Sequence, residues 1–318
     1  MKNEKSLIYG PVASRRLGMS LGIDVVPYKI CSFDCIYCQI GRTRETTVKR
    51  SPFGLSDAIF KALAEKLEGG IRADHITLGG SGEPTLNMET GDIIRGIKKM
   101  TAIPVAVLTN GSMLWDQQVR KDLQAADIVL PSLDAADAET FAAINRPHPD
   151  ISFSRLVDGL VSFSKDFPGE IWLEIFLVKS MNTSDVHIDQ FKAMVDRIKP
   201  DRVHLNTSVR PPAEPFAMAV DRKTLEAIAL KIGGNAEVIA EFKDHQEKVA
   251  ERSLHEQDLL DMLLRRPCTI SDMAGALNAD EGRVAGLVEK LVAEGRVTSR
   301  ASGTTIYYLG RENPEASV

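Results

Sequence analysis

The chain has 318 residues, 43% of them hydrophobic and 26% charged, with a formal net charge of −5 at pH 7. This composition is ordinary for a folded soluble protein, and the negative charge excludes a wholesale nucleic-acid coat. No stretch approaches the roughly 20 apolar residues that a membrane-spanning helix needs. The N-terminus lacks the apolar core of a signal peptide, so we expect a cytoplasmic protein.

Apolar runs alternate with amphipathic segments along the first 240 residues. The apolar runs predict six strands, near residues 20–26, 75–80, 105–110, 127–132, 171–179 and 202–209. Helical periodicity predicts six helices, near residues 55–68, 88–100, 115–125, 152–166, 184–198 and 221–231. Such alternation indicates parallel βα units with right-handed crossovers. The expected fold is α/β: a partial (β/α)6 TIM-type barrel over residues 1–240, with its chemistry at the carboxyl ends of the strands.

The composition changes after residue 240. Residues 241–256 are highly charged and are expected to form a linker that runs into a helix. Residues 257–311 show three short helical patterns and then two short strands around a glycine turn. This order predicts a small winged helix-turn-helix domain. Residues 312–318 are expected to form a flexible tail.

Three of the four cysteines fall in one short segment, PYKICSFDCIYCQIG, as Cys31, Cys35 and Cys38. Clustered cysteines in a reducing compartment are typical of metal ligands or redox groups rather than of a disulfide scaffold. Three thiolates in a tight loop can hold three irons of a 4Fe–4S cluster and leave the fourth iron open for a small molecule. No further Cys or His follows nearby to close a structural site; Cys268 is in the other predicted domain. The alternatives are a zinc site lacking one ligand and a redox thiol cluster.

A glycine-rich segment, GGSGEPTL, follows the second predicted strand and contains Gly80, Gly82 and Glu83. Glycine lets a backbone approach a ligand closely, and a carboxylate at a strand end can accept hydrogen bonds from an ammonium group. The alternative is a glycine-rich turn in which Pro84 starts a helix.

The cysteine loop, with Tyr37 just before its third cysteine, and the SGEPTL segment resemble the radical SAM superfamily. Residues 9–43, SGEPTL and FAAINRP are similar to its wyosine-synthase-like iron–sulfur oxidoreductase branch. The resemblance implies a 4Fe–4S cluster on the three cysteines and bound S-adenosylmethionine (SAM). It implies reductive cleavage of SAM to methionine and a 5′-deoxyadenosyl radical, with flavodoxin or ferredoxin as the kind of reductant required. Wyosine synthesis itself needs a second cluster on three further cysteines, and only Cys268 is left over.

The resemblance also implies which residues contact SAM. Polar residues at the strand ends would meet its ribose or its methionine carboxylate, although turn formation and helix capping explain the same residue types. The implied SAM-binding residues are Tyr37, Gly80, Gly82, Glu83, Asn110, Ser132, Asp134 and Lys179.

Four arginines lie where a substrate is expected. Arg15 and Arg16 precede the first predicted strand, Arg146 follows the fourth and Arg210 follows the sixth. Arginine suits bidentate recognition of anions, so an anionic substrate, tRNA included, is expected. No catalytic side chain is identified.

The C-terminal domain leaves its partner open. Its candidate recognition segment, residues 281–295, carries more Glu than Lys and Arg, whereas phosphate contacts need an excess of basic residues. A protein contact or a lid is therefore favoured over nucleic-acid binding. The leading hypothesis is a radical SAM enzyme with one cluster and an unidentified substrate. The alternatives are an iron–sulfur redox sensor that binds nucleic acid and an activase of a partner protein.

Overall fold

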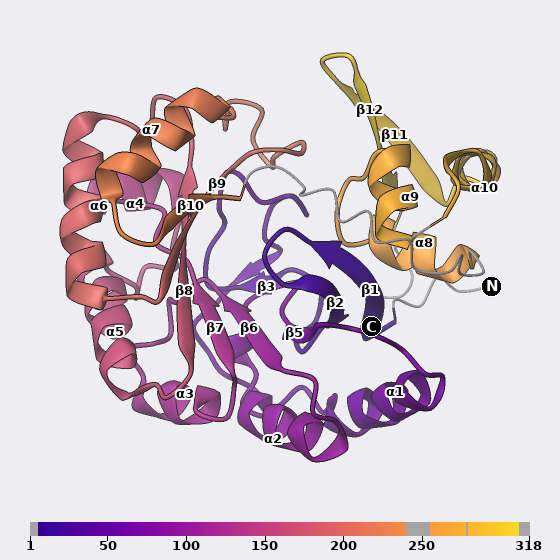
Figure 1. Cartoon of the computed structure of the whole chain (residues 1–318), viewed down its shortest axis with the longest axis horizontal. Helices are drawn as coiled ribbons and strands as arrows, with labels where there is room; N and C mark the ends of the chain where they lie inside the picture. Colours follow the sequence, from indigo (N-terminus) through magenta and orange to yellow (C-terminus); the bar gives the residue numbers. More distant parts are fainter. Residues whose placement is uncertain (1–5, 240–254, 278, 312–318) are drawn as a thin grey trace.

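The computed structural model of the chain describes residues 6–239, 255–277 and 279–311. Its centre is an eight-stranded sheet with the order β1-β2-β5-β6-β7-β8-β9-β10. From β2 onward each neighbouring pair is parallel, whereas β1 runs antiparallel to β2. Helices α1 to α7 lie along the outside of the curved sheet (Figure 1). The prediction of a mixed α/β fold with a parallel sheet is confirmed.

All six predicted strands form, and two more join them at the edges of the sheet. The predicted strands are β2 (Gly18–Ile23), β5 (His75–Leu78), β6 (Val105–Thr109), β7 (Ile128–Pro131), β8 (Glu170–Leu177) and β9 (Arg202–Thr207). The additional strands are β1 (Ile8–Ser14) and β10 (Ala236–Val238). β1 contains a Gly-Pro pair, which in sequence is typical of a turn. In the structure the strand continues through this pair, and its register against β2 shifts between Tyr9 and Val12. Proline is accommodated at such bulges and on edge strands.

The six predicted helices also form. They are α1 (Ser56–Glu68), α2 (Thr90–Met100), α3 (Gln117–Leu123), α5 (Phe153–Asp166), α6 (Asp185–Ile198) and α7 (Arg222–Ile232). Four of them, α3, α5, α6 and α7, begin at a side-chain cap. Ser152 and Ser184 are the N-cap residues of α5 and α6, and each accepts a hydrogen bond from a backbone N–H of the first turn. A further helix, α4 (Ala138–Asn145), begins at the cap Asp137 and was not predicted.

The C-terminal unit, α8 to β12, lies at the open side of the curved sheet (Figure 1). It consists of α8 (Glu256–Leu263), α9 (Ile270–Leu277) and α10 (Glu281–Ala293), followed by the antiparallel pair β11 (Val297–Ser302) and β12 (Thr305–Gly310). The element order is the one expected, while the winged-helix assignment remains a prediction. Residues 241–254 of the predicted linker and the predicted tail, residues 312–318, lie outside the described residues.

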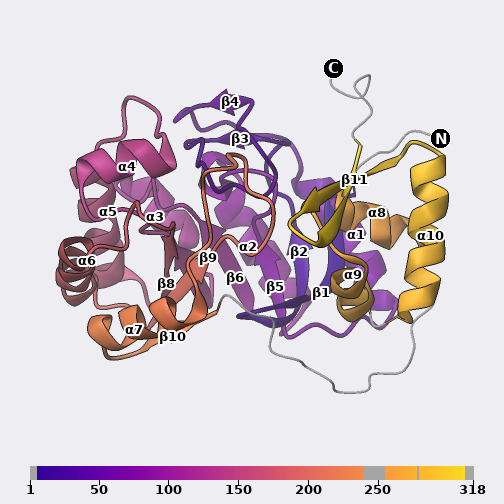
Figure 2. The ribbon, with the colours of Figure 1, turned by 90° about the horizontal axis from the view of Figure 1, so that it is seen from above.

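The C-terminal unit is joined to the barrel by apolar packing. α8 and α9 pack against β1, and α10 lies on the far side of them (Figure 2). Val12 of β1 belongs to the same buried cluster as Leu259, Leu263 and Met273. Strand β1 therefore has one neighbour in the sheet and a second, helical neighbour from the C-terminal unit.

A buried ion pair crosses the same boundary. Arg265, just after α8, lies 2.8 Å from the carboxylate of Asp24, and each side chain is 5% exposed. The guanidinium also donates to the carbonyl oxygens of Ser6 and Asp261 and lies 4.0 Å from the centre of the Tyr9 ring. Charges this deeply buried need such partners, and these contacts link Arg265 to the segment that follows β2 and to the residues before β1.

Among the described helices, none has the length and apolar character required to cross a membrane.

Candidate functional site

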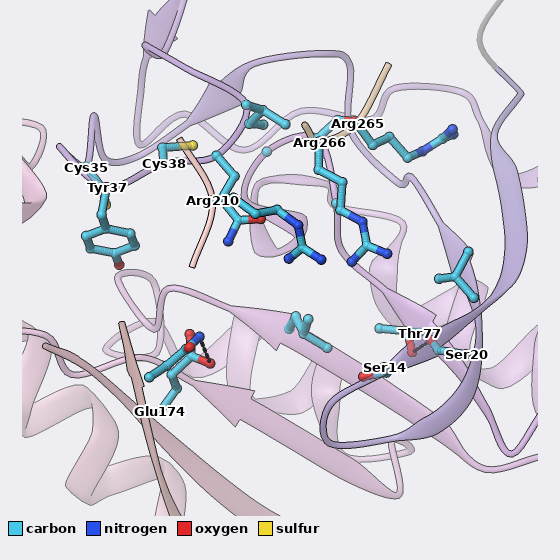
Figure 3. A pocket seen from close by; sticks show the side chains of 18 of the residues that line it. Ser14, Ser20, Cys35, Tyr37, Cys38, Thr77, Glu174, Arg210, Arg265 and Arg266 are labelled. Carbon is cyan, nitrogen blue, oxygen red and sulfur yellow. Dashed lines mark hydrogen bonds between the residues drawn. The ribbon is translucent and has the colours of Figure 1, made fainter. Parts of the chain in front are cut away.

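A cavity of about 390 Å³ opens between the cysteine loop, the inner face of the sheet and the end of α8 (Figure 3). This volume is within the range of small-molecule sites. The cysteine loop contributes Cys31, Cys35, Tyr37 and Cys38 to its lining. Most of the other lining residues come from β1, β2, the Gly80–Gly82 turn, β8, β9 and the C-terminal unit.

The three predicted cysteines all line this cavity, and each is partly buried. Cys31 ends the short strand β3 (Ile30–Cys31), which pairs with β4 (Glu45–Thr46). The Cys38 N–H donates to the Cys35 carbonyl at 3.1 Å, which closes a turn between the second and third cysteines. Local backbone bonds therefore hold the three thiols on one side of the cavity.

The cysteine loop is held in place by the end of α4. The N–H of Ile36 donates to the carbonyl of Ile144 at 2.9 Å, and Phe33 forms a bridge with Pro147. Phe33 and Ile36 are buried in this contact. The INRP segment thus packs against the cysteine loop. Its Arg146, expected to meet substrate, does not line the cavity and donates to Glu214 at 2.7 Å. A contact between Arg146 and the substrate stays a prediction.

Two side-chain amides donate toward the cysteine sulfurs. Nδ2 of Asn110 lies 3.6 Å from Sγ of Cys31, and Nδ2 of Asn145 lies 3.4 Å from Sγ of Cys35. The same amides also donate to Ser32 and Asp134, both at 2.8 Å. Groups in such positions orient metal ligands and modify their basicity.

Burial favours the protonated form of all three thiols. It raises the pKa of Cys31 to about 12 and the pKa of Cys35 well above its usual value. The pKa of Cys38 is raised as well, although the nearby Lys29 ammonium opposes this shift. A metal bound there would displace the thiol protons. Within the described ranges, no three His, Cys, Asp or Glu side chains are arranged to hold one metal ion.

The glycine-rich turn lies directly against the cysteine loop. The Lys29 N–H donates to the carbonyl of Ser81 at 2.7 Å, and the Glu83 N–H donates to that of Ile30 at 3.0 Å. A Cβ on Gly82 would overlap the Ile30 carbonyl oxygen. The absence of a side chain at Gly82 therefore lets the glycine-rich turn pack against the backbone of Ile30, the residue before Cys31.

Replacing Gly82 with alanine should displace the cysteine loop. Overlap with a backbone atom cannot be relieved by a rotamer change, and forced overpacking costs about 1–3 kcal/mol or more. We expect Gly82→Ala to lower the cluster content after reconstitution at least tenfold, measured by iron and sulfide analysis. Gly286→Ala is the control, because Gly286 lies within α10 with nothing within 4 Å of an added Cβ. Equal cluster content in the two variants would contradict this account.

The carboxylate of Glu83 is bound by protein donors, and its contact with SAM stays a prediction. It is 2% exposed and does not line the cavity. It accepts hydrogen bonds from Thr109 Oγ1 at 2.6 Å, from the Asn110 N–H at 2.7 Å and from the Thr85 N–H at 3.0 Å. Glu83 thus caps the 3-10 helix η1 (Pro84–Leu86) and ties the end of β5 to the end of β6. Its oxygens are directed at these protein donors rather than at the cavity.

The other predicted SAM contacts fall into two groups. Tyr37, Gly80 and Gly82 line the cavity, and the Tyr37 ring stacks on Phe176 with 3.8 Å between ring centres. Asn110, Ser132 and Asp134 do not line the cavity. Asp134 accepts hydrogen bonds from the hydroxyl of Tyr37 and from the amide of Asn145. Burial raises the pKa of Asp134 to about 6. Lys179 is exposed and does not line the cavity, and its contact with SAM stays a prediction.

Three of the four predicted arginines reach the cavity. Arg15 and Arg16 are on the β1–β2 turn, at the amino ends of the parallel strands, and their side chains extend inward. Arg15 donates to Oδ1 of Asn206 at 2.9 Å, and Arg16 forms an ion pair with Glu174. Arg210 extends inward from the segment after β9 (Figure 3).

Sequence reasoning missed the part of the cavity that the C-terminal unit supplies. Met262, Arg265 and Arg266 line it, although they lie some 220 residues beyond the cysteine loop in the chain. The adjacent arginines repeat the Arg-Arg pair at positions 15 and 16. That repetition was the available signal, but nothing local indicated that α8 would pack beside β1.

Comparison with known proteins agrees with this geometry. The model of the Radical SAM superfamily matches residues 25–191. The chain is 30% identical over 311 residues to the UPF0026 protein of Methanocaldococcus jannaschii, and the match covers 96% of each. It is 39% identical over 303 residues to a protein of Brachyspira hyodysenteriae named GTPase Obg. That match covers 95% of this chain but 45% of the relative, so the chain spans less than half of that protein's length.

A solved structure with the same fold is a radical SAM methyltransferase from Sphaerobacter thermophilus. The TM-score is 0.51 at 17% identity, with 69% of this chain and 65% of that chain covered. At this identity the likeness concerns the fold alone. The wyosine-synthase-like branch is not distinguished by these matches. The expected cofactors, a 4Fe–4S cluster and SAM, are those that members of the matched family bind. The chain belongs to the radical SAM superfamily.

Proposed function

We propose that this protein cleaves SAM reductively with one 4Fe–4S cluster held by Cys31, Cys35 and Cys38, and that the resulting radical abstracts hydrogen from an anionic substrate. The observation that carries the proposal is the meeting of these three thiols at one cavity, against the glycine-rich turn. Three thiols suit a cluster that keeps one iron free of protein ligands. When bound, such a cluster supplies the electron that breaks a carbon–sulfur bond of SAM.

The chain's own residues would hold and shield the reactants. Asn110 and Asn145 donate toward two of the sulfurs and would orient them. The backbone of Gly80 to Gly82 and the ring of Tyr37 line the cavity and are the nearest candidates for contact with SAM. We assign Glu83, Ser132 and Asp134 to the supporting layer behind them. Flavodoxin or ferredoxin as reductant and a cytoplasmic location remain predictions.

The proposal is tested by anaerobic reconstitution. The reconstituted protein is mixed with dithionite and SAM, and 5′-deoxyadenosine is measured by liquid chromatography. Wild type should form it at a rate proportional to its cluster content. Protein that carries a full cluster but forms no 5′-deoxyadenosine would contradict the proposal.

Glu83→Ala should retain the cluster and bind SAM more weakly. The change leaves the Asn110 N–H and the Thr109 hydroxyl without their buried acceptor, at a cost of about 1–3 kcal/mol each. We therefore expect the end of β6 to loosen and the Kd for SAM to rise about tenfold, measured by equilibrium dialysis. Glu139→Ala, at an exposed position in the first turn of α4, is the control. A normal Kd for SAM in Glu83→Ala would show that this acceptor is dispensable.

For the C-terminal unit we propose a winged-helix-like lid rather than a nucleic-acid reader. Support comes from Met262, Arg265 and Arg266, which line the cavity. The outer helix α10 carries exposed Glu281 and Glu289, and its Lys290 is paired with Glu256 at 2.9 Å. A phosphate-binding surface needs an excess of basic residues. The redox-sensor alternative therefore lacks the charge it requires on this helix, and no specific observation favours the activase.

A further inference from the structure

The cavity has an unbalanced charge. Of the described residues that line it, five are arginines and one is Lys29, whereas the single carboxylate is Glu174. Glu174 forms an ion pair with Arg16, and Arg265 is paired with Asp24 from behind the wall. Arg210 lies 3.6 Å from the carboxylate of Asp272, which does not line the cavity. Arg15 and Arg266 complete the five lining arginines.

These three arginines come from three separate parts of the chain. Arg15 is on the β1–β2 turn, Arg210 follows β9 and Arg266 follows α8. The guanidinium groups of Arg210 and Arg266 extend side by side into the same part of the cavity (Figure 3). The side chain of Arg210 is 2% exposed and lies 3.6 Å from the carboxylate of Asp272. Arg15 donates a hydrogen bond to the side-chain oxygen of Asn206. Convergence from three elements indicates a site built by the tertiary fold.

Like charges crowded in a buried place are costly. Burial lowers the pKa of Arg15 to about 10, and the neighbouring charge of Arg210 adds to this shift. Burial also lowers the pKa of Arg210, and the charge of Arg266 lowers it further. An anion bound between the guanidinium groups would relieve this repulsion.

Hydroxyl groups line the opposite wall of the cavity. Ser14, Ser20 and Thr77 face the two guanidinium groups across it (Figure 3), and the Ser20 and Thr77 hydroxyls are 2.5 Å apart. Guanidinium and hydroxyl donors together suit a phosphate group, which offers several acceptor oxygens. The volume of about 390 Å³ and the exposed Glu281 and Glu289 of α10 favour a small molecule over a nucleic acid.

We propose that Arg210 and Arg266, with Arg15 beside them, bind the phosphate group of a small phosphorylated substrate, and that the C-terminal unit completes this site by supplying Arg266. The inference rests on the proposed function, since it assigns the substrate class of the same cavity. Arg265 is its positioning residue, because its ion pair with Asp24 holds the end of α8 against the barrel.

The test measures phosphate-group binding separately from SAM cleavage. Inorganic pyrophosphate is titrated by calorimetry into reconstituted wild type and into Arg266→Gln, Arg210→Gln and Arg300→Gln, without dithionite or SAM. Arg300 is an exposed arginine of β11 and provides the matched control. We expect wild type and Arg300→Gln to bind alike and the two cavity variants to bind at least tenfold more weakly. Arg266→Lys should lie between, because it retains the charge without the bidentate geometry.

Two results would overturn the inference. One is a failure of the binding pattern: wild type does not bind pyrophosphate, or Arg266→Gln and Arg210→Gln both bind it as wild type does while their melting temperatures also match wild type. The other is competition between SAM and pyrophosphate, with weaker SAM binding in Arg266→Gln, which would assign these arginines to the SAM carboxylate. Because 5′-deoxyadenosine formation by wild type is measured independently, failure of this inference is distinguishable from failure of the proposed function.

Discussion

Cys35→Ala should abolish both cluster assembly and 5′-deoxyadenosine formation. Cys35 is the middle one of three thiols that line the cavity, and the amide of Asn145 donates toward its sulfur. Without it two cysteines would remain, and the fourth cysteine of the chain, Cys268, is buried in the C-terminal unit. Two thiolates cannot supply the three protein ligands that such a cluster requires. The visible absorption of the reconstituted protein and its iron content measure the first effect, and chromatography measures the second.

Cys268→Ala is the matched control for this experiment. It removes one buried sulfur at a cost of about 1 kcal/mol, and its Sγ is engaged only with the Arg266 carbonyl at 3.6 Å within the part of the chain described. Cluster content and SAM cleavage should match wild type. Retention of a full, active cluster by Cys35→Ala, or its loss in Cys268→Ala, would show that the ligands have been assigned wrongly.

Arg265→Leu should destabilise the protein by about 3–5 kcal/mol, because it leaves the carboxylate of Asp24 buried without its charged partner. Both side chains of the pair are 5% exposed, so water cannot replace the lost guanidinium. A Cβ on Gly80 would overlap Asp24, so this carboxylate also lies against the glycine-rich turn. We therefore expect SAM cleavage to fall along with stability. Urea unfolding followed by circular dichroism gives the free energy of unfolding.

Two further variants make this prediction specific. Arg296→Leu removes an arginine of the same unit that is 27% exposed and paired with Glu256. Exposed pairs contribute about 0–1 kcal/mol, so its effect should be small. The double variant Arg265→Leu with Asp24→Leu should recover part of the stability, since it removes the orphaned charge. Equal destabilisation by Arg265→Leu and Arg296→Leu would contradict a special role for the buried pair.

The site shows where sequence reasoning succeeded and where it did not. The grouping of the three cysteines follows from their spacing within one loop, whereas the cavity that they line is formed by distant segments. Arg15, Arg16 and Arg210 were expected near the substrate and do line the cavity, although Arg15 and Arg16 reach it from the opposite end of the strands. Arg146 and Lys179 were expected there too, and both lie outside it. Arg146 and Arg210 are both arginines that follow a predicted strand, so residue type and position could not distinguish the one that lines the cavity from the one that does not.

By itself, the sequence determined the six central strands, six of the surrounding helices, the element order of the C-terminal unit and the segment that carries the three cysteines. Periodicity, capping and spacing are local properties that each segment carries with it. Only the tertiary structure decided that β1 joins the sheet antiparallel and that Arg266 enters the cavity. It also decided that the Glu83 carboxylate accepts hydrogen bonds from Thr85, Thr109 and Asn110. These depend on which distant segments meet, and a side chain takes its role from the partners that surround it after folding.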